Sequence, residues 1–61
     1  MLIFTLMMLT FLDGELLDIE DIAIYELNTT LEVCEKYIKP AFEQTKEFDV
    51  YTIKIEGECM K

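Results

Sequence analysis

The first segment of the chain places the strongest constraint on its fold. Residues 2–12 carry no charge, and Thr5 and Thr10 are the only polar residues among aliphatic and aromatic ones. A helix spanning a membrane needs about 20 apolar residues, whereas a run of this length suits a strand buried on both faces. Asp13-Gly14 follows directly and indicates a tight hairpin turn, because Gly accepts a positive φ.

The next segment, residues 15–27, has the alternation of a second strand. Its apolar and polar positions exchange places at Glu20-Asp21, and one extra residue in a strand has that effect. A bulge is therefore predicted there. Residues 51–59 form the clearest alternating segment, with Tyr51, Ile53, Ile55 and Cys59 on one face and Gly57 as a second candidate bulge.

Between these strands the apolar spacing becomes helical. Thr29 and Glu32 fit a capping box, and the apolar spacing continues to Thr45. Glu32–Lys36 and Glu35–Lys39 are i,i+4 pairs in the favourable order. Pro40 removes one helical hydrogen bond and clashes with the preceding turn. The pattern predicts one helix over residues 30–47 with a kink near 36–40.

The expected fold is a single α+β domain covering residues 1–61, in the order β-β-α-β. A right-handed crossover gives a three-stranded antiparallel sheet of order 2-1-3 with one helix packed on one face. That arrangement leaves one face of the first strand uncovered. Either Leu2, Phe4, Leu6 and Met8 or Ile3, Met7, Leu9 and Phe11 should then be exposed, which is typical of an interface. We assign the apolar interface to Phe4, Leu6 and Met8.

The net charge of −8 lies entirely in the middle of the chain. Residues 13–35 contain eight acids and no base, while residues 36–61 contain five of each. Such a field repels nucleic acid and anionic membrane and attracts basic protein surfaces. Three interpretations stay open: a solvated face, an electrostatic docking surface, or a calcium site at Asp18, Glu20 and Asp21 that lacks the usual loop spacing. The candidate partner-binding residues are Asp13, Glu15, Asp18, Glu20, Asp21 and Glu26.

Cys34 and Cys59 are expected at the same end of the domain, because the helix start and the end of the last strand meet there. Two interpretations remain for this pair. The absence of a basic leader region and a small-residue cleavage site indicates a cytoplasmic protein, and that compartment favours two buried thiols. A disulfide is the alternative.

Several kinds of chemistry have no candidate residues. His, Arg, Ser and Trp are absent, which removes the commonest general base and hydroxyl nucleophile. Two cysteines do not make a zinc site, and no Gly-rich phosphate loop is present. We therefore expect no catalytic residues, no metal, no cofactor and no enzymatic activity.

The layout of the chain resembles that of very small bacteriophage-encoded host-inhibitor proteins. The features that carry the resemblance are Leu9-Thr10, the Asp13-Gly14-Glu15 turn, Ile24-Tyr25, the Asn28-Thr29-Thr30 cap and Cys34. The size and element order are similar to the Dmd antitoxin of T-even phages, which blocks a host RNA-degrading toxin, and small acidic anti-CRISPR proteins are similar in size and charge. The likeness is one of layout, and no functional residue is carried over.

These observations lead to a hypothesis of binding rather than catalysis. The leading hypothesis is a phage-type inhibitor in the cytoplasm of the host bacterial cell. Its acidic surface would occupy a basic groove of a defence or nucleic-acid-handling protein, as a mimic of nucleic acid, without binding nucleic acid or membrane directly. The alternatives are an antitoxin against a host RNase and a homodimer or small structural subunit that uses the apolar first strand.

Overall fold

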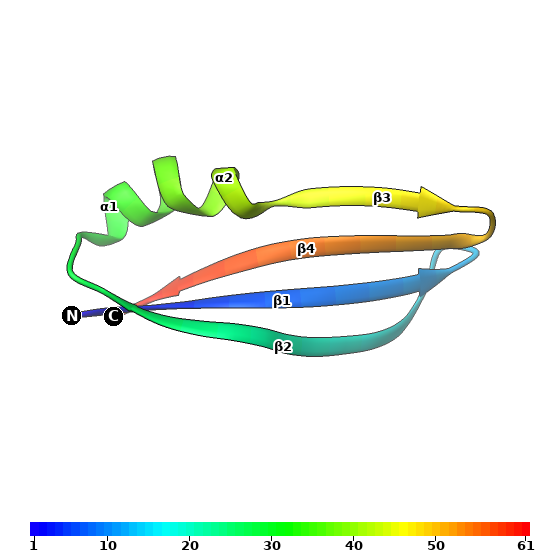
Figure 1. Ribbon diagram of the computed structural model, residues 1–61, viewed down its shortest axis with the longest axis horizontal. Helices are drawn as coiled ribbons and strands as arrows, with labels where there is room; N and C mark the ends of the chain where they lie inside the picture. Colours follow the sequence, from blue (N-terminus) through cyan, green and yellow to red (C-terminus); the bar gives the residue numbers. More distant parts are fainter.

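The computed structural model describes residues 1–61 and has the α+β class expected from the sequence. One antiparallel sheet has the strand order β2-β1-β4-β3, and a single short helical segment packs on one of its faces (Figure 1). The strands are β1 (Leu2–Leu12), β2 (Glu15–Leu27), β3 (Gln44–Phe48) and β4 (Tyr51–Met60). The helical segment consists of α1 (Leu31–Val33), η1 (Cys34–Ile38) and α2 (Lys39–Phe42).

The expected arrangement of three strands is present, with one strand added at the edge. β1 pairs with β2 and with β4, so the first strand is central as predicted. β3 pairs only with β4, and it occupies residues that the helical spacing had assigned to the end of a helix. The prediction of a three-stranded sheet is therefore wrong in strand number, while the order of its three strands holds within the four-stranded sheet.

The helix ends five residues earlier than expected. Glu43 is extended, with φ −73° and ψ 129°, so the helical backbone stops after Phe42. A helix reaching residue 47 would leave the outer edge of β4 without hydrogen-bond partners, and β3 supplies them from Gln44 to Phe48. The chain turns from β3 into β4 at Asp49. Its φ of 54° lies in the left-handed region, which Asp tolerates better than most residues.

The first hairpin has the turn predicted from its dipeptide. Asp13 and Gly14 have φ values of 48° and 81°, and β2 begins at the next residue. Positive φ at both central residues is the signature of the turn whose twist matches the two strands. The Asp13 amide also donates a 3.0 Å hydrogen bond to the Val50 carbonyl, which ties this turn to the neighbouring hairpin.

β2 contains two irregularities opposite the regular β1. Leu6 pairs with Ala23 and Met7 with Asp21, so Ile22 is the extra residue. This confirms the bulge predicted beside Glu20-Asp21. A second register shift leaves Leu17 unpaired. Gly57 marks no bulge, because the pairing of β1 with β4 is continuous through Leu6 and Gly57.

The helical segment begins at a capping threonine and then changes from an α-helical to a π-helical turn. Thr30, rather than Thr29, is the N-cap, and its hydroxyl accepts a 3.2 Å hydrogen bond from the Val33 amide. The predicted capping box is therefore wrong, because the third helical position after Thr30 is Val33, which has no carboxylate. The expected kink takes the form of a π turn, in which the Lys39 amide donates to the Cys34 carbonyl just before Pro40. None of these short helical turns could span a membrane.

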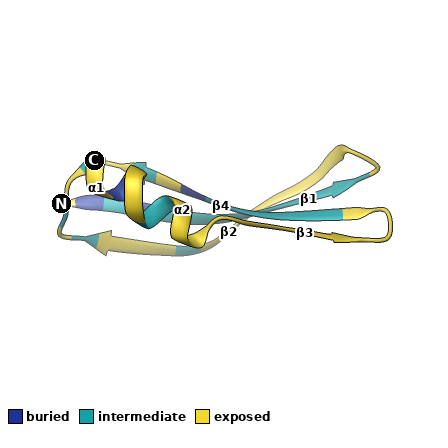
Figure 2. Cartoon of the chain, turned by 90° about the horizontal axis from the view of Figure 1, so that it is seen from above, coloured by how far each residue is buried: buried dark blue, intermediate teal, exposed yellow.

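The core is small and lies at one end of the molecule. Only four of the 61 residues are buried, and three of them, Leu2, Phe4 and Cys34, form the hydrophobic core beneath the helix. Figure 2 shows the buried positions gathered at the helical end, with exposed and half-buried backbone beyond it. The molecule measures 39 × 17 × 13 Å. The half of the sheet beyond the helix therefore has no covering layer on either face.

Candidate functional site

The acidic residues lie mainly on one edge of the sheet. β2 is an edge strand with five acids and no base, and all five acidic side chains are exposed. They are Glu15, Asp18, Glu20, Asp21 and Glu26. Asp13 adds an exposed carboxylate in the turn before the strand. All six residues predicted for electrostatic binding are thus accessible, and they follow the length of one edge.

The bulge at Ile22 distributes these acids over both faces of the sheet. Residues paired directly across an antiparallel ladder share a face, so Asp18 and Glu20 lie on the helix side with Thr10 and Met8. Glu15, opposite Leu12, lies there too. Asp21 and Glu26 pair with Met7 and Ile3 and therefore lie on the other face. The acids therefore follow one edge of the sheet and face both of its sides.

This separation also bears on the calcium hypothesis. Asp18 and Glu20 share one face, while Asp21 is directed to the other, so the three carboxylates do not converge. No group of three or more His, Cys, Asp or Glu side chains in the structure is arranged to hold a metal ion. Because Ca²⁺ takes six to eight oxygen ligands around one point, the proposed trio is not a calcium site in this fold.

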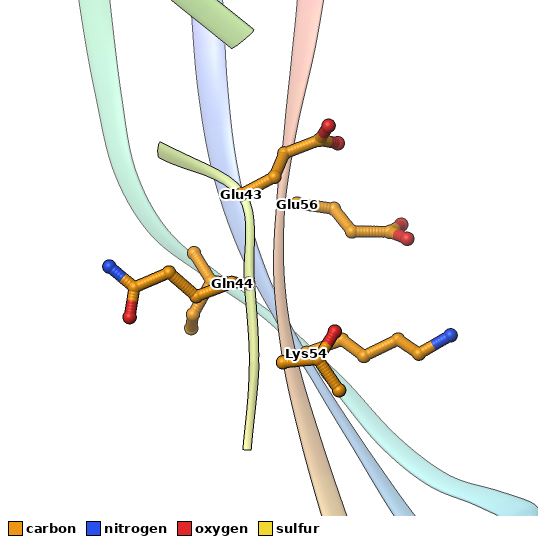
Figure 3. A pocket seen from close by; sticks show the side chains of 6 residues that line it. Glu43, Gln44, Lys54 and Glu56 are labelled. Atoms are coloured by element: carbon orange, nitrogen blue, oxygen red, sulfur yellow. The ribbon is translucent and has the colours of Figure 1, made fainter. Parts of the chain in front are cut away.

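The largest pocket lies where the chain passes from the helix into β3. Its volume is about 260 Å³, and its lining consists of Glu43, Gln44, Thr45, Lys54, Ile55 and Glu56. Figure 3 shows Glu43, Glu56 and Lys54 directed to one side of the two strands and Gln44 to the other. The lining groups do not converge on one point, so the pocket offers no constellation for acid–base or nucleophilic chemistry.

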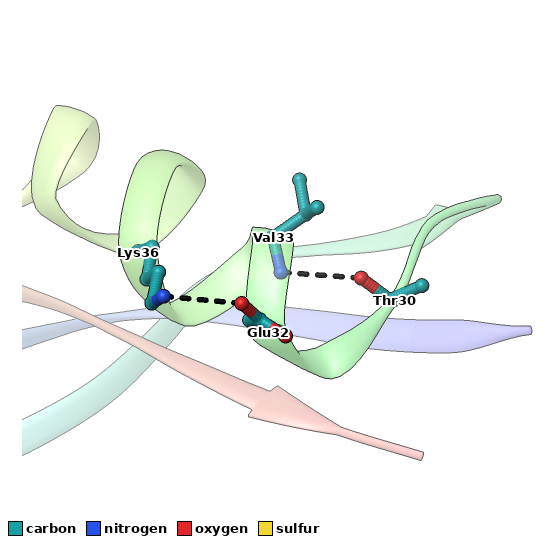
Figure 4. Close-up of polar contacts among 4 residues, drawn as sticks. All are labelled: Thr30, Glu32, Val33 and Lys36. Atoms are coloured by element: carbon teal, nitrogen blue, oxygen red, sulfur yellow. Dashed lines mark hydrogen bonds and ion pairs between the residues drawn. The ribbon is translucent and has the colours of Figure 1, made fainter.

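The helix contributes a separate pair of charges at the opposite end from the Asp13 turn. Lys36 Nζ lies 3.0 Å from Glu32 Oε1, as the i,i+4 spacing predicts (Figure 4). Both side chains are exposed, and such pairs contribute little to stability. Glu32 is partly neutralised by this contact.

The predicted apolar interface is wrong for two of its three residues. Phe4 is 1% exposed, and its ring centroid lies 5.4 Å from that of Phe42 in the helix. Leu6 packs against the same core. The helix covers these positions because Cys34 anchors it over the β4 face that carries Cys59. Of the three predicted residues, only Met8 lies outside the core on that face.

Uncovered apolar residues also lie on the opposite side of β1. The sheet surface opposite the helix, which we call the open face, carries Ile3, Met7, Leu9 and Phe11 from β1. β2 adds three exposed residues that the sequence analysis had not assigned to a site: Leu16, Ile19 and Ile24. The bulge predicted at Glu20-Asp21 was the available signal, because a phase change moves Ile24 to the face of Ile19.

Cys34 and Cys59 form a disulfide 25 residues apart in sequence. Their proximity is the one expected from the topology, and the structure has the bonded form rather than two thiols. Cys34 is fully buried, and Leu31, Ile38 and Cys59 pack around the core that contains it. The bond joins the only helical layer to the sheet, so its role in this structure is to hold the core closed.

No protein-family model, curated protein or solved structure matches this chain.

Proposed function

We propose that this protein is a non-enzymatic, acidic inhibitor of the kind encoded by phages, which binds a bacterial defence or nucleic-acid-handling protein. The observation that carries the proposal is the composition of β2, an exposed edge strand with five acids and no base. A surface of this sign raises the rate of encounter with basic grooves and repels nucleic acid itself. An anti-CRISPR protein would act in this way.

The spacing of the charges supports contact at a few points rather than full imitation of DNA. The 13 residues of β2 follow the long axis of the molecule, which measures 39 Å. Five charges over that length are far sparser than duplex DNA, which carries one charge per about 1.7 Å. β2 therefore has the negative charge of nucleic acid, but at a much lower charge density. Specificity would then come from the apolar residues between the acids.

An antitoxin that neutralises a host RNase would use the same strand. An RNase binds a polyanion, so its substrate groove is basic and complementary to β2 in charge. The two functions differ in the protein captured and not in the surface used. Capture from bacterial lysate on immobilised protein, followed by identification of the bound protein, separates a defence nuclease from a toxin.

The experiment that tests the electrostatic mode measures affinity for the captured protein at rising salt. We expect binding to weaken steeply with salt and to be lost in the D18K/E20K variant. The matched control is E35K/E47K, which changes the net charge by the same amount at exposed residues of the helix and β3. An affinity indifferent to salt, or equal losses in the two variants, would contradict a role for β2.

A further inference from the structure

The open face has the composition of an interface. Leu9 pairs with Ile19 and Phe11 with Leu16, so apolar residues of β1 and β2 lie side by side along it. Lys54 of β4 reaches the same face, since its Nζ lies 5.5 Å from the centre of the Phe11 ring. An apolar stripe on two strands is thus bordered by charged residues of β4. An apolar centre with a polar rim is the usual anatomy of a protein interface.

A single copy of the chain buries less of its surface than a compact chain of this length does. Its radius of gyration is 12.9 Å, whereas about 10.5 Å is typical for a compact chain of this length. Its accessible surface is 4545 Å², against about 4,100 Å² expected for its mass. Three buried hydrophobic residues form the whole core. A chain with these dimensions gains stability from any partner that covers its sheet.

We propose that a second copy of the chain covers the open face, forming a twofold-symmetric sandwich of two four-stranded sheets. Two sheets packed face to face lie about 10 Å apart and interdigitate their inner side chains. In a twofold arrangement the apolar stripe of one copy meets the stripe of the other. Four acids share the open face and lie beside the stripe: Asp21, Glu26, Glu56 and Glu58. The polar groups of β4 and the outer edge of β2 remain at the rim, where water can reach them.

The area of the open face can be compared with that of a standard interface. Ten residues of β1 pair with β4, which makes the face about 34 Å long, and its three long strands make it about 14 Å wide. The projected area is then about 480 Å², and accessible surface exceeds projection because side chains stand out from the sheet. A standard interface buries about 800 Å² per partner. A stable dimer must therefore use nearly the whole face.

Edge-to-edge pairing of two copies is opposed by the same strand. β2 is interrupted at Leu17 and Ile22, and bulges with charged residues are the usual protection of an exposed edge. Two β2 strands would also bring five acids against five. The sandwich avoids pairing through this interrupted strand, and only Asp21 and Glu26 of the five β2 acids lie on the covered face. It leaves Glu15, Asp18 and Glu20 outside the interface on the helix side, so each dimer would present two acidic edges to a target.

Concentration-dependent stability tests this proposal on the full chain. We expect sedimentation equilibrium to give twice the chain mass at micromolar concentration, and the melting temperature to rise with protein concentration. I19K should weaken self-association by about 100-fold or more, since it places an unpaired charge in the interface. Y37K is the matched control: it makes the same charge change on the helix, where Tyr37 is 70% exposed, and should leave the dimer intact.

Salt separates this proposal from the proposed function. Two copies of charge −8 repel one another, so the dimer should be maintained or strengthened at high salt, while binding of a basic target weakens. Three results would overturn the dimer: a wild-type monomer whose melting temperature is independent of concentration, equal self-association in I19K, or a monomer that binds phosphatidylcholine vesicles through this face. If I19K fails to fold, the concentration dependence of the wild type decides.

Discussion

Gly57 of β4 packs directly against the ring of Phe4 of β1. Any side chain at position 57 would overlap with that ring. A Cβ atom built on Gly57 would lie 2.5 Å from both Cε1 and Cζ of the ring. Phe4 is also held by the helix through Phe42 and by β2 through Tyr25, with ring centroids 5.4 and 6.4 Å away. Because the ring packs against Gly57, Phe42 and Tyr25 together, a side chain at position 57 would have to displace it.

G57A is therefore expected to lower the free energy of unfolding by about 1 to 3 kcal/mol, the usual cost of overpacking a core. Chemical denaturation measures the change. In an F4L background the same substitution should cost less, because the smaller side chain leaves room for the new methyl group. Equal costs in the two backgrounds would show that contact with the ring is not the cause.

The disulfide between Cys34 and Cys59 is expected to contribute about 3 to 4 kcal/mol to stability, from the entropy of closing a loop of 25 residues. C34A/C59A should unfold at correspondingly lower denaturant concentration. Dithiothreitol should lower the stability of the wild type toward that of the variant and leave the variant unchanged. A reductant that shifts neither protein would contradict a disulfide in solution.

The helix cap gives a test at neighbouring residues of the same type. T30A should reduce stability by about 1 kcal/mol, because the Val33 amide loses the hydroxyl that accepts its hydrogen bond. T29A serves as the control and should have a smaller effect, since Thr29 makes no side-chain hydrogen bond in the structure. Thermal unfolding of the two variants decides between Thr30 and the capping box centred on Thr29.

The first hairpin turn depends on backbone conformation alone. Nothing lies within 4 Å of a Cβ built on Gly14, yet its φ is 81°. G14A should therefore destabilise by about 1 to 2 kcal/mol, the cost of a side chain in left-handed backbone. D13G changes the neighbouring residue, whose φ of 48° Gly also accepts. Circular dichroism melts should show a clear loss for G14A and a much smaller change for D13G.

Several features could be predicted from the sequence because they depend on neighbouring residues. The uncharged run before Asp13-Gly14 indicated a central strand and a tight turn, and the phase change near Asp21 indicated a bulge. The two cysteines were placed at one end by element order. The exposed acids of β2 followed from charge alone. These inferences need only the two-residue period of a strand and the φ requirement of a turn.

Other features were settled only by tertiary structure. The helical spacing continued through Thr45, but Gln44 to Phe48 pair with β4 as a strand, and backbone pairing outweighed the weak helical preference. The covered face of β1 depended on register. Phe4 lies opposite Cys59, so the disulfide to the helix places Phe4 beneath it. A shift of one residue would have covered Ile3 and Thr5 instead, and no local pattern specifies that choice.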